Sequence, residues 1–386
     1  MAETAQMIRQ RIITLSWLTL CMLFLPGCWD YQKINDRSQI IAVGVEPTSD
    51  NQKMFTYTLQ VPVFQQPGQG GTAPGSGGEE PTSNYHNYVI SALSFDEAVS
   101  KAQTQSDKGL YLGNIQLILY STKLSHAQFR RITGEFMRNP RFEKLSWVEF
   151  TSQPPSEVLA AKTDLTPADS FDRILSSSVK QHGYTVRTHL WEFWRDFWTI
   201  GRQPYGGEIQ KTPTGFRVDG LVVPVQHNHC MELTPEETLY FNMLCRRVQS
   251  ISFNVIDGAE SFGVGEVKTK SNLSVSMNRG RGRVLRAQIR INAVILRDES
   301  DGLVPLNHKD IKRYERVMSD QIKVQVDQII KKFQHNETDP FGFGETLVTQ
   351  NPRMAEYVSS RWPHDFAHAT TNIQVEVRLK RKGALR

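Results

Sequence analysis

One cysteine lies where its thiol could be modified chemically. Cys28 follows the small residue Gly27, just after an apolar run at residues 12–25 that is itself preceded by two arginines. A basic segment, a short apolar segment and then a cysteine are typical of a lipoprotein signal peptide. A cysteine thiolate is nucleophilic enough to form a thioether with a diacylglyceryl group. The order of residues therefore predicts a signal peptide over residues 1–27 and a lipid anchor on Cys28.

The length of the apolar run bears on the alternatives, which are an ordinary secretory signal and a membrane-spanning anchor with an incidental cysteine. A stable spanning helix needs about 20 apolar residues, and the run at 12–25 is shorter. After residue 27 the longest apolar run, residues 115–120, has the length of a strand. We therefore expect a water-soluble body that is tethered at one point. Two acyl chains would make the tether nearly permanent, because each buried CH₂ contributes about 0.8 kcal/mol.

Composition argues against a nucleic-acid partner. The formal net charge is +5, which is small compared with the basic surfaces that bind nucleic acids. Cys230 and Cys245 remain once the signal peptide and Cys28 are set aside. A disulfide between them is allowed outside the cytoplasm, although two buried free thiols are the simpler interpretation.

The sequence contains no recognisable catalytic constellation. Motifs typical of a nucleophilic serine, a zinc protease, a Walker A loop or an EF-hand are missing. Residues 227–230 read His-Asn-His-Cys, which zinc could use, but a solvated loop is the simpler interpretation. The basic turn at residues 279–283 could contact lipid phosphates, although a solvated hairpin tip explains it as well. We expect no enzyme activity, no cofactor and no metal.

Hydrophobic patterning predicts alternating strands and helices in the N-terminal half. Strands are expected at residues 40–45, 55–63, 85–91 and 115–120 and around Trp147, and helices after Ser94, through Phe129 and Phe136, and after Pro155. Ser94 and Glu97 have the spacing of a capping box. Residues 67–83 are rich in Gly, Pro and Ser, a composition that buries too little surface to order itself. We expect a long mobile loop there.

Three of the seven tryptophans lie in one segment, residues 186–198. At helical spacing this segment has one apolar face and two flanking tryptophans: Val186, Leu190, Phe193, Trp194 and Phe197, with Trp191 and Trp198 beside them. Tryptophan favours membrane interfaces, but the opposite side lacks the basic character of a membrane-surface helix. A helix wedged between domains or against a partner protein is the favoured interpretation. Trp191, Trp194 and Trp198 are therefore the candidate partner surface.

The C-terminal part is predicted to be α+β. Alternating apolar residues indicate strands over residues 267–277 and 285–295, joined as a hairpin, and a last strand over residues 373–379. Apolar residues spaced by three and four indicate a long amphipathic helix over residues 311–333. Antiparallel strands packed on a long helix give an α+β fold class with several mixed α/β domains.

The expected domain organisation follows from these patterns. An N-terminal α/β domain is expected over residues 28–200 and a C-terminal α+β region over residues 201–386. The second region can divide into a small lobe at residues 201–250 and a main domain at residues 251–386.

Two specific segments connect the chain to a known family. Residues 27–30 read Gly-Cys-Trp-Asp, and near the other end the chain contains Phe341, Gly342, Phe343, Gly344 and Glu345 in succession. Less specific patterns occur at residues 43–45, 94–98 and 220–223. In these features the chain resembles the GerAC-type, or Ger(x)C, spore germination lipoproteins, which are the C subunits of nutrient germinant receptors.

The resemblance implies a non-enzymatic subunit on the outer face of the inner spore membrane, which supports receptor assembly and the germinant response. It implies two membrane-embedded partners, an A-type subunit with a large soluble region and a transporter-like B-type subunit to which nutrient binding is ascribed. Physically, the two glycines at residues 341–345 allow a tight turn and the two Phe rings can pin it to the core. We therefore expect this segment to be structural.

Functions from other classes stay open at this point. The main alternative is a solute-binding lipoprotein that delivers a ligand to a membrane transporter, which would need a cleft between two similar lobes. The unequal halves of the chain count against it. A lipid-anchored hydrolase is a third interpretation, and it lacks a nucleophile motif.

Overall fold

The computed structural model describes most of the chain beyond the N-terminal segment. The described residues are 9, 11–13, 15–17, 37–48, 53–63, 84–177, 183–225, 230–245, 248–258, 260–278, 282–297 and 307–381. Residues 39–386 form one compact unit and residues 1–38 another. No helix among the described residues is long and apolar enough to cross a bilayer.

Four features that the sequence predicts lie outside the described residues. They are the lipid anchor at Cys28, the loop at residues 67–83, the cluster at residues 227–229 and the tip of the basic turn at residues 279–281. These features stay predictions.

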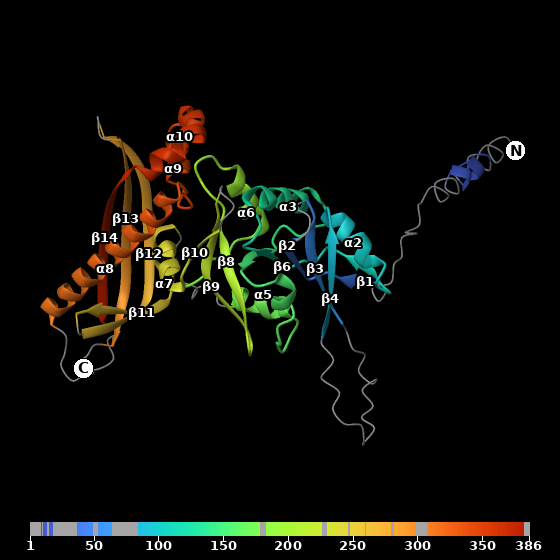
Figure 1. Ribbon diagram of the computed structural model, residues 1–386, viewed down its shortest axis with the longest axis horizontal. Coiled ribbons are helices and arrows are strands. Elements are labelled where there is room, and N and C mark those ends of the chain that lie inside the picture. The colour runs from blue at the N-terminus through green and yellow to red at the C-terminus, as the bar shows by residue number, and fades with distance from the viewer. Residues whose placement is uncertain are drawn as a thin grey trace, which may run out of the picture. The chain divides into compact units, whose positions relative to one another are not determined.

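An eight-stranded sheet is the framework of the N-terminal half (Figure 1). Its strands are Ala42–Pro47 (β2), Phe55–Pro62 (β3), Tyr85–Ala92 (β4), Leu117–Ser121 (β6), Trp147–Thr151 (β7), Gly206–Thr212 (β8), Gly215–Pro224 (β9) and Cys230–Leu233 (β10). They follow the order β10-β9-β8-β7-β6-β2-β3-β4. The central strands β2, β6, β7 and β8 run parallel, and antiparallel pairs extend the sheet at both edges. Two short strands complete this half, Arg37–Gln39 (β1) and Gly109–Tyr111 (β5).

Helices cover both faces of this sheet, because both faces carry apolar side chains. One apolar cluster joins the sheet to Phe95–Gln103 (α2), His126–Arg138 (α3) and Leu190–Trp198 (α6). A second cluster joins the other face to Pro155–Val158 (α4) and Pro167–Ser177 (α5). The N-terminal half is thus a three-layer α/β arrangement, as the alternating pattern predicts.

The predicted cap of α2 is present in a modified form. The backbone N–H of Glu97 donates to the Ser94 hydroxyl over 3.3 Å, as in a capping box. The Glu97 carboxylate accepts a hydrogen bond from the N–H of Leu93, one residue before the cap, over 2.9 Å. In a standard capping box the Glu97 carboxylate would accept the N–H of Ser94 itself. Here it accepts the N–H of the preceding residue, so the second bond is shifted by one residue.

The eight-stranded sheet does not stop at residue 200, where the sequence analysis places the end of the N-terminal domain. β8 pairs in parallel with β7, and β9 and β10 extend the sheet to Leu233. The cause is pairing between strands that are far apart in the sequence, which hydrophobic periodicity does not report. The segment expected as a small lobe at residues 201–250 thus supplies the edge of the sheet and the helix Pro235–Cys245 (α7).

A four-stranded sheet and a long helix dominate the C-terminal half, and the predicted α+β fold class is confirmed. The elements are Ile251–Asp257 (β11), Glu260–Asn278 (β12), Gly282–Arg297 (β13), His308–His335 (α8), Phe343–Gln350 (α9), Pro352–Met354 (η2), Ala355–Ala367 (α10) and Thr370–Arg381 (β14). β12 and β13 pair antiparallel, as the predicted hairpin requires, and β11, which the sequence analysis does not predict, pairs antiparallel with β12. β14 pairs parallel to β13, because the helices between them carry the chain back to the end where β13 began.

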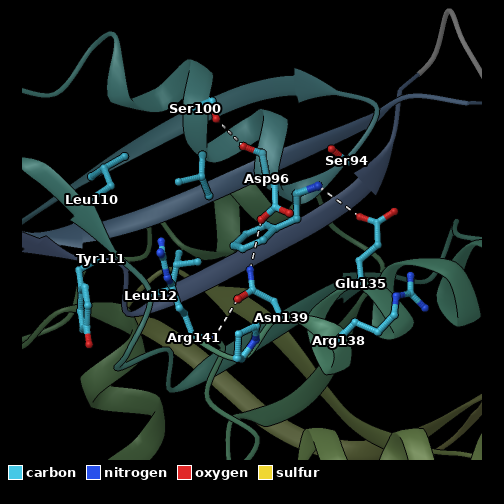
Figure 2. Close-up of a pocket in the computed structure, with 13 residues that line it drawn as sticks. Ser94, Asp96, Ser100, Leu110, Tyr111, Leu112, Glu135, Arg138, Asn139 and Arg141 are labelled. Atoms are coloured by element: carbon cyan, nitrogen blue, oxygen red, sulfur yellow. Dashed lines mark hydrogen bonds between the residues drawn. The ribbon is translucent and has the colours of Figure 1, made fainter.

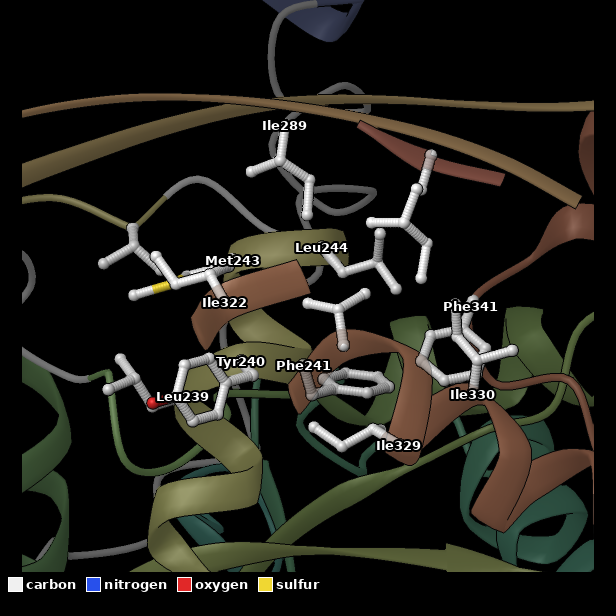
Figure 3. Close-up of a cluster of buried hydrophobic side chains, with 14 of the residues drawn as sticks. Leu239, Tyr240, Phe241, Met243, Leu244, Ile289, Ile322, Ile329, Ile330 and Phe341 are labelled. Atoms are coloured by element: carbon white, nitrogen blue, oxygen red, sulfur yellow. The ribbon is translucent and has the colours of Figure 1, made fainter. Parts of the chain in front are cut away.

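Helix α7 is buried on every side between the two sheets. Its residues from Thr238 to Leu244 are all buried, and its apolar side chains form one cluster with β9, β12, β13 and α8. Figure 3 shows Phe241 of α7 among Ile329 and Ile330 of α8, with Ile289 of β13 directed toward them from the sheet. Most of the buried side chains of α7 are apolar, and the polar Asn242 donates to the carbonyls of Gly183 and Thr185, so the helix can be buried on every side.

The central cluster predicts a sharp contrast between two positions of α8. Phe333 is fully buried, whereas Val324 is 52% exposed. Phe333→Ala should lower the free energy of unfolding by about 3–5 kcal/mol, because it removes transfer energy and leaves a cavity. Val324→Ala should change it by less than about 0.5 kcal/mol. Urea denaturation of both variants measures the difference, and equal losses would contradict this packing.

Candidate functional site

A tight turn leads from the end of the long helix α8 into α9. Gly342 adopts φ 82°, a left-handed conformation that glycine adopts at little cost. Phe341 and Phe343 on either side of it are buried. The centre of the Phe341 ring lies 5.3 Å from the centre of the Phe333 ring, in an edge-to-face arrangement, and 5.4 Å from the centre of the Phe241 ring. The turn is thereby fixed to the central apolar cluster.

A buried carboxylate organises this turn. Asp339 is 4% exposed, and one of its oxygens accepts the N–H groups of Phe341 and Gly342 over 3.1 and 3.0 Å. The other oxygen accepts the N–H of Gly344 and the indole Nε1–H of Trp362, both over 2.9 Å. The carboxylate thus satisfies donors at the start of α9 and ties that turn to α10.

The pKa of Asp339 reflects a competition between burial and hydrogen bonding. Burial is the largest influence and raises the pKa of this carboxyl to about 6, while the N–H donors of the turn and of Trp362 oppose it. Sequence reasoning missed Asp339. The available signal was Asp before Pro at the start of a glycine-rich segment, which is typical of a side chain that caps its own turn.

The same turn contacts the segment that follows α6. The N–H of Glu345 donates to the carbonyl of Gly201 over 3.1 Å, and the N–H of Gln203 donates to the carbonyl of Asp339 over 3.0 Å. A Cβ on Gly344 would lie 2.7 Å from the Cα of Gly201 and 2.5 Å from Nε1 of Trp362. Both halves of the chain therefore meet here through backbone that tolerates no side chain at these positions.

Charged side chains reinforce this junction. The Arg202 guanidinium, whose side chain is 19% exposed, forms an ion pair with Glu345 over 2.9 Å. Asp196 of α6 is also buried, and burial raises the pKa of its carboxyl, while Arg202 and Arg195 oppose the shift. Arg195 reaches Asp196 over 2.7 Å. We name the contacts of residues 201–203 with residues 339–345 the aspartate junction.

The aromatic helix α6 runs into the aspartate junction. Leu190 and Phe193 are buried in the N-terminal core, and Trp194 packs so closely on α3 that a Cβ on Gly134 would lie 3.1 Å from its ring. Trp191 and Trp198 are 40% and 56% exposed. The structure therefore divides the three candidate tryptophans into one that packs internally and two that face solvent.

A groove of about 320 Å³ lies between the end of α6 and the junction. Its lining includes Trp198, Ile200 and Arg202 on one side and Asp339 and Trp362 on the other. The two segments that the sequence analysis selected, α6 and residues 341–345, are thus brought to one place on the molecule.

Arg130 of α3 also lines this groove and stabilises its exposed tryptophan. Its guanidinium lies 4.2 Å from the centre of the Trp198 ring, a cation–π arrangement. Trp198 is therefore held in a fixed orientation even though more than half of it is exposed. A preordered aromatic side chain of this kind suits an interface anchor.

A larger cavity of about 770 Å³ lies between α2, β5 and the end of α3 (Figure 2). Several of its polar groups bond to one another: Asn139 donates to Asp96 over 3.2 Å, and the N–H of Phe95 donates to Glu135 over 3.2 Å. Arg138 and Arg141 also line this cavity.

Metal-binding and disulfide chemistry find no support among the described residues. That part of the chain contains no group of three His, Cys, Asp or Glu side chains placed to hold a metal. Cys230 and Cys245 are half-buried and form no disulfide, which agrees with the interpretation that the sequence analysis favours. Burial raises the pKa of the Cys230 thiol to about 12, which keeps it protonated and unreactive.

Asp339 gives the junction a predictable pH dependence. The folded state holds its proton more tightly than the unfolded chain, so its contribution to stability is largest below pH 4 and falls as the pH rises to about 6. Asp339→Asn does not titrate, and it turns an NH₂ group toward two N–H donors. The stability advantage of the wild type over this variant should shrink by about 3 kcal/mol between pH 4 and pH 7. Denaturation at several pH values measures it, and an advantage that grows with pH would show that the donors outweigh burial.

Two family models cover nearly the whole chain. Residues 30–210 match the family described as "Spore germination protein N-terminal domain". Residues 223–383 match the family described as "Spore germination B3/ GerAC like, C-terminal".

Individual relatives and a solved structure agree with these matches. The chain is 20% identical to spore germination protein KC of Bacillus subtilis, over 98% of this chain and 97% of the relative. It is also 20% identical to spore germination protein GerQC of Bacillus cereus, over 95% and 98%. Its fold is similar to the crystal structure of the GerBC protein, with a TM-score of 0.54 and 16% identity over 87% of this chain and 96% of that one. The chain belongs to the Ger(x)C family of spore germination proteins.

Proposed function

We propose that this chain is a non-enzymatic, lipid-anchored subunit of a nutrient germinant receptor. The observation that carries the proposal is the match of both halves of the chain to spore germination families. Relatives named as the germination proteins KC and GerQC support a role as a receptor C subunit. The partners would be the A-type and the transporter-like B-type subunits, at the outer face of the inner spore membrane.

The geometry supports a role through contacts rather than chemistry. Trp191 and Trp198 expose large aromatic surfaces on a helix whose other side is fixed in the core. Interfaces draw much of their energy from such rigid aromatic anchors surrounded by polar residues. The groove beside Trp198 would receive a side chain of the partner. The segment 341–345 would then be structural, because the aspartate junction shapes one wall of this groove.

The solute-binding alternative gains no support from the architecture. It requires a cleft between two lobes of similar construction. Here an eight-stranded mixed sheet stands against a four-stranded sheet with one long helix, and helix α7 packs between them. The cavity beside α2 lies within the N-terminal half, between α2, β5 and α3, and not between two lobes. We therefore retain the receptor subunit as the single proposal.

The lipid anchor is tested by Cys28→Ala. Residues 39–386 form a compact unit without it, so the variant should fold normally. Membrane retention should fall, because the acyl chains are lost. Nutrient-triggered germination should be reduced rather than abolished, because assembly becomes bimolecular while protein contacts persist. Fractionation of spore membranes and germination kinetics measure both effects. Normal partitioning with an unchanged germination rate would contradict the anchor.

The docking surface is tested by Trp198→Ala. Truncation of an interface anchor should weaken assembly with the A-type and B-type subunits by about tenfold or more, which corresponds to 1.4 kcal/mol. Helix α6 should stay intact, because its buried side is unchanged. The matched control is Ile256→Ala on β11, which truncates another large apolar side chain, 65% exposed. Immunoblots of the partner subunits in spore membranes provide the measurement, and equal levels in both variants would exclude Trp198 as an anchor.

A further inference from the structure

One face of the C-terminal sheet lies open. In β12, β13 and β14 alternate side chains point into the apolar cluster formed with α7 and α8, and Figure 3 shows Ile289 on this inner side. The residues between them point outward, and most of them are exposed. We call the outward side chains of these three strands the open face.

The open face is strongly cationic at its centre. Its cationic residues are all exposed: Lys268, Lys270, Arg286, Arg290, Arg378 and Lys380. Among the described residues of these strands the exposed acids are Glu376, which is shared between Arg290 over 3.8 Å and Arg378 over 2.7 Å, and Glu266, beside the irregular pairing of β12 with β13. The formal charge of the face is therefore +4, from six cations and two anions. The whole chain carries a formal net charge of +5, so most of its excess positive charge lies on this face.

Strand register arranges these charges in a plane. Lys270 lies opposite Arg290, which lies opposite Glu376. One step along, Lys268 lies opposite Asn292 and, across it, Arg378. Neighbouring strands are about 4.8 Å apart, and alternate residues of a strand are about 7 Å apart. The face therefore presents a flat lattice of cations separated by amides and hydroxyls.

The centre of the open face lacks the anchors of a protein interface. Apolar outward residues of β13, such as half-buried Val294 and exposed Leu296, lie near the end of that strand. Protein interfaces depend on central aromatic or apolar side chains that fill pockets. A flat cationic lattice without them suits a surface whose negative charges move laterally to meet it, as lipids do. Nucleic acid is disfavoured because the face offers no aromatic side chain on which bases could stack.

We propose that the open face binds the anionic phospholipid headgroups of the membrane to which the chain is tethered. Each Lys or Arg near an anionic bilayer contributes about 1 kcal/mol, so six cations together would orient the tethered body on the membrane. The proposal rests on the lipid anchor for its setting, since a tether holds the face near headgroups at high local concentration. The binding itself does not require the anchor.

The test uses the chain from residue 28 onward with Cys28→Ala, so that it is independent of lipidation. The probe is vesicles of phosphatidylcholine with 30% phosphatidylglycerol. Sedimentation should show binding that is absent with pure phosphatidylcholine and is lost at 0.5 M NaCl, where screening is strong. If the chain does not bind these vesicles, but Cys28→Ala lowers membrane retention and germination in spores as expected, this inference is overturned and the proposed function stands.

Matched variants decide whether the open face is responsible. The face variant replaces Lys268, Lys270, Arg286 and Arg290 with Gln. The control variant makes the same net change on exposed helix positions away from the sheet, Lys309, Lys323, Arg353 and Arg361. The face variant should bind at least about 100-fold more weakly, and the control variant should bind like the wild type.

The remaining outcomes are decisive as well. Circular dichroism checks that both variants fold, and if the fourfold face variant does not, Lys268→Gln with Lys270→Gln should still weaken binding by about tenfold. If the face and control variants lose vesicle binding equally, the proposal is overturned, because binding then depends on the net charge of the chain and not on the open face. Binding of poly-L-glutamate through the face, without binding of vesicles, would overturn it in favour of an acidic protein partner.

Discussion

The buried carboxylate of Asp339 is the constraint on which the junction of the two halves depends. A buried charge is expensive unless hydrogen bonds replace its water, and here four N–H groups do so. Three come from the turn into α9, and the fourth comes from Trp362 of α10. The backbone of that turn then lies against Gly201, at the end of the segment leading from α6. Loss of the carboxylate would therefore leave donors unsatisfied and release the groove beside Trp198.

Helix α7 imposes a second constraint, because all its residues from Thr238 to Leu244 are buried. It packs between the edge of the N-terminal sheet and the C-terminal sheet, so neither half completes its core alone. Strand β9 shows the same coupling, since Leu221 and Val223 belong to the C-terminal cluster and Val222 to the N-terminal one. A body of this kind presents rigid surfaces. That property fits a subunit whose contribution to a receptor is contact and orientation.

Local patterns of the sequence predict most elements of this fold. The alternation in β12 and β13 and the three-and-four spacing in α8 specify periods of two and of 3.6 residues, and the structure contains the corresponding hairpin and helix. Helix α7 is not predicted by amphipathicity, because its residues from Thr238 to Leu244 include no exposed polar face. Its start is marked by Thr234 and Glu237, which exchange the two bonds of a capping box. Strand direction is also beyond local patterns, and β14 is parallel to β13 although the sequence analysis groups it with antiparallel strands.

The candidate site divides in the same way. The exposure of Trp191 and Trp198 follows from helical spacing, since both flank the apolar side of α6. Arg202 could not be paired with the turn at residues 341–345 from sequence, because its contacts join segments that are more than a hundred residues apart. The bonds from Asp339 to this turn are local, but its burial depends on the packing of α8, α9 and α10, which local patterns do not report. The amino-acid composition does not predict the open face. Its charges are spread over three strands and become a single surface only through their register.

A photo-cross-linking residue at position 198 tests the central claim most directly. In intact spores, irradiation should join the chain at this position to an A-type or B-type receptor subunit, because the aromatic surface of α6 would lie in the interface. The same residue at position 256 of β11, where Ile256 is exposed, should give no such product. Cross-links to a receptor subunit from position 256 and none from position 198, or no cross-linked subunit from either position, would contradict the account.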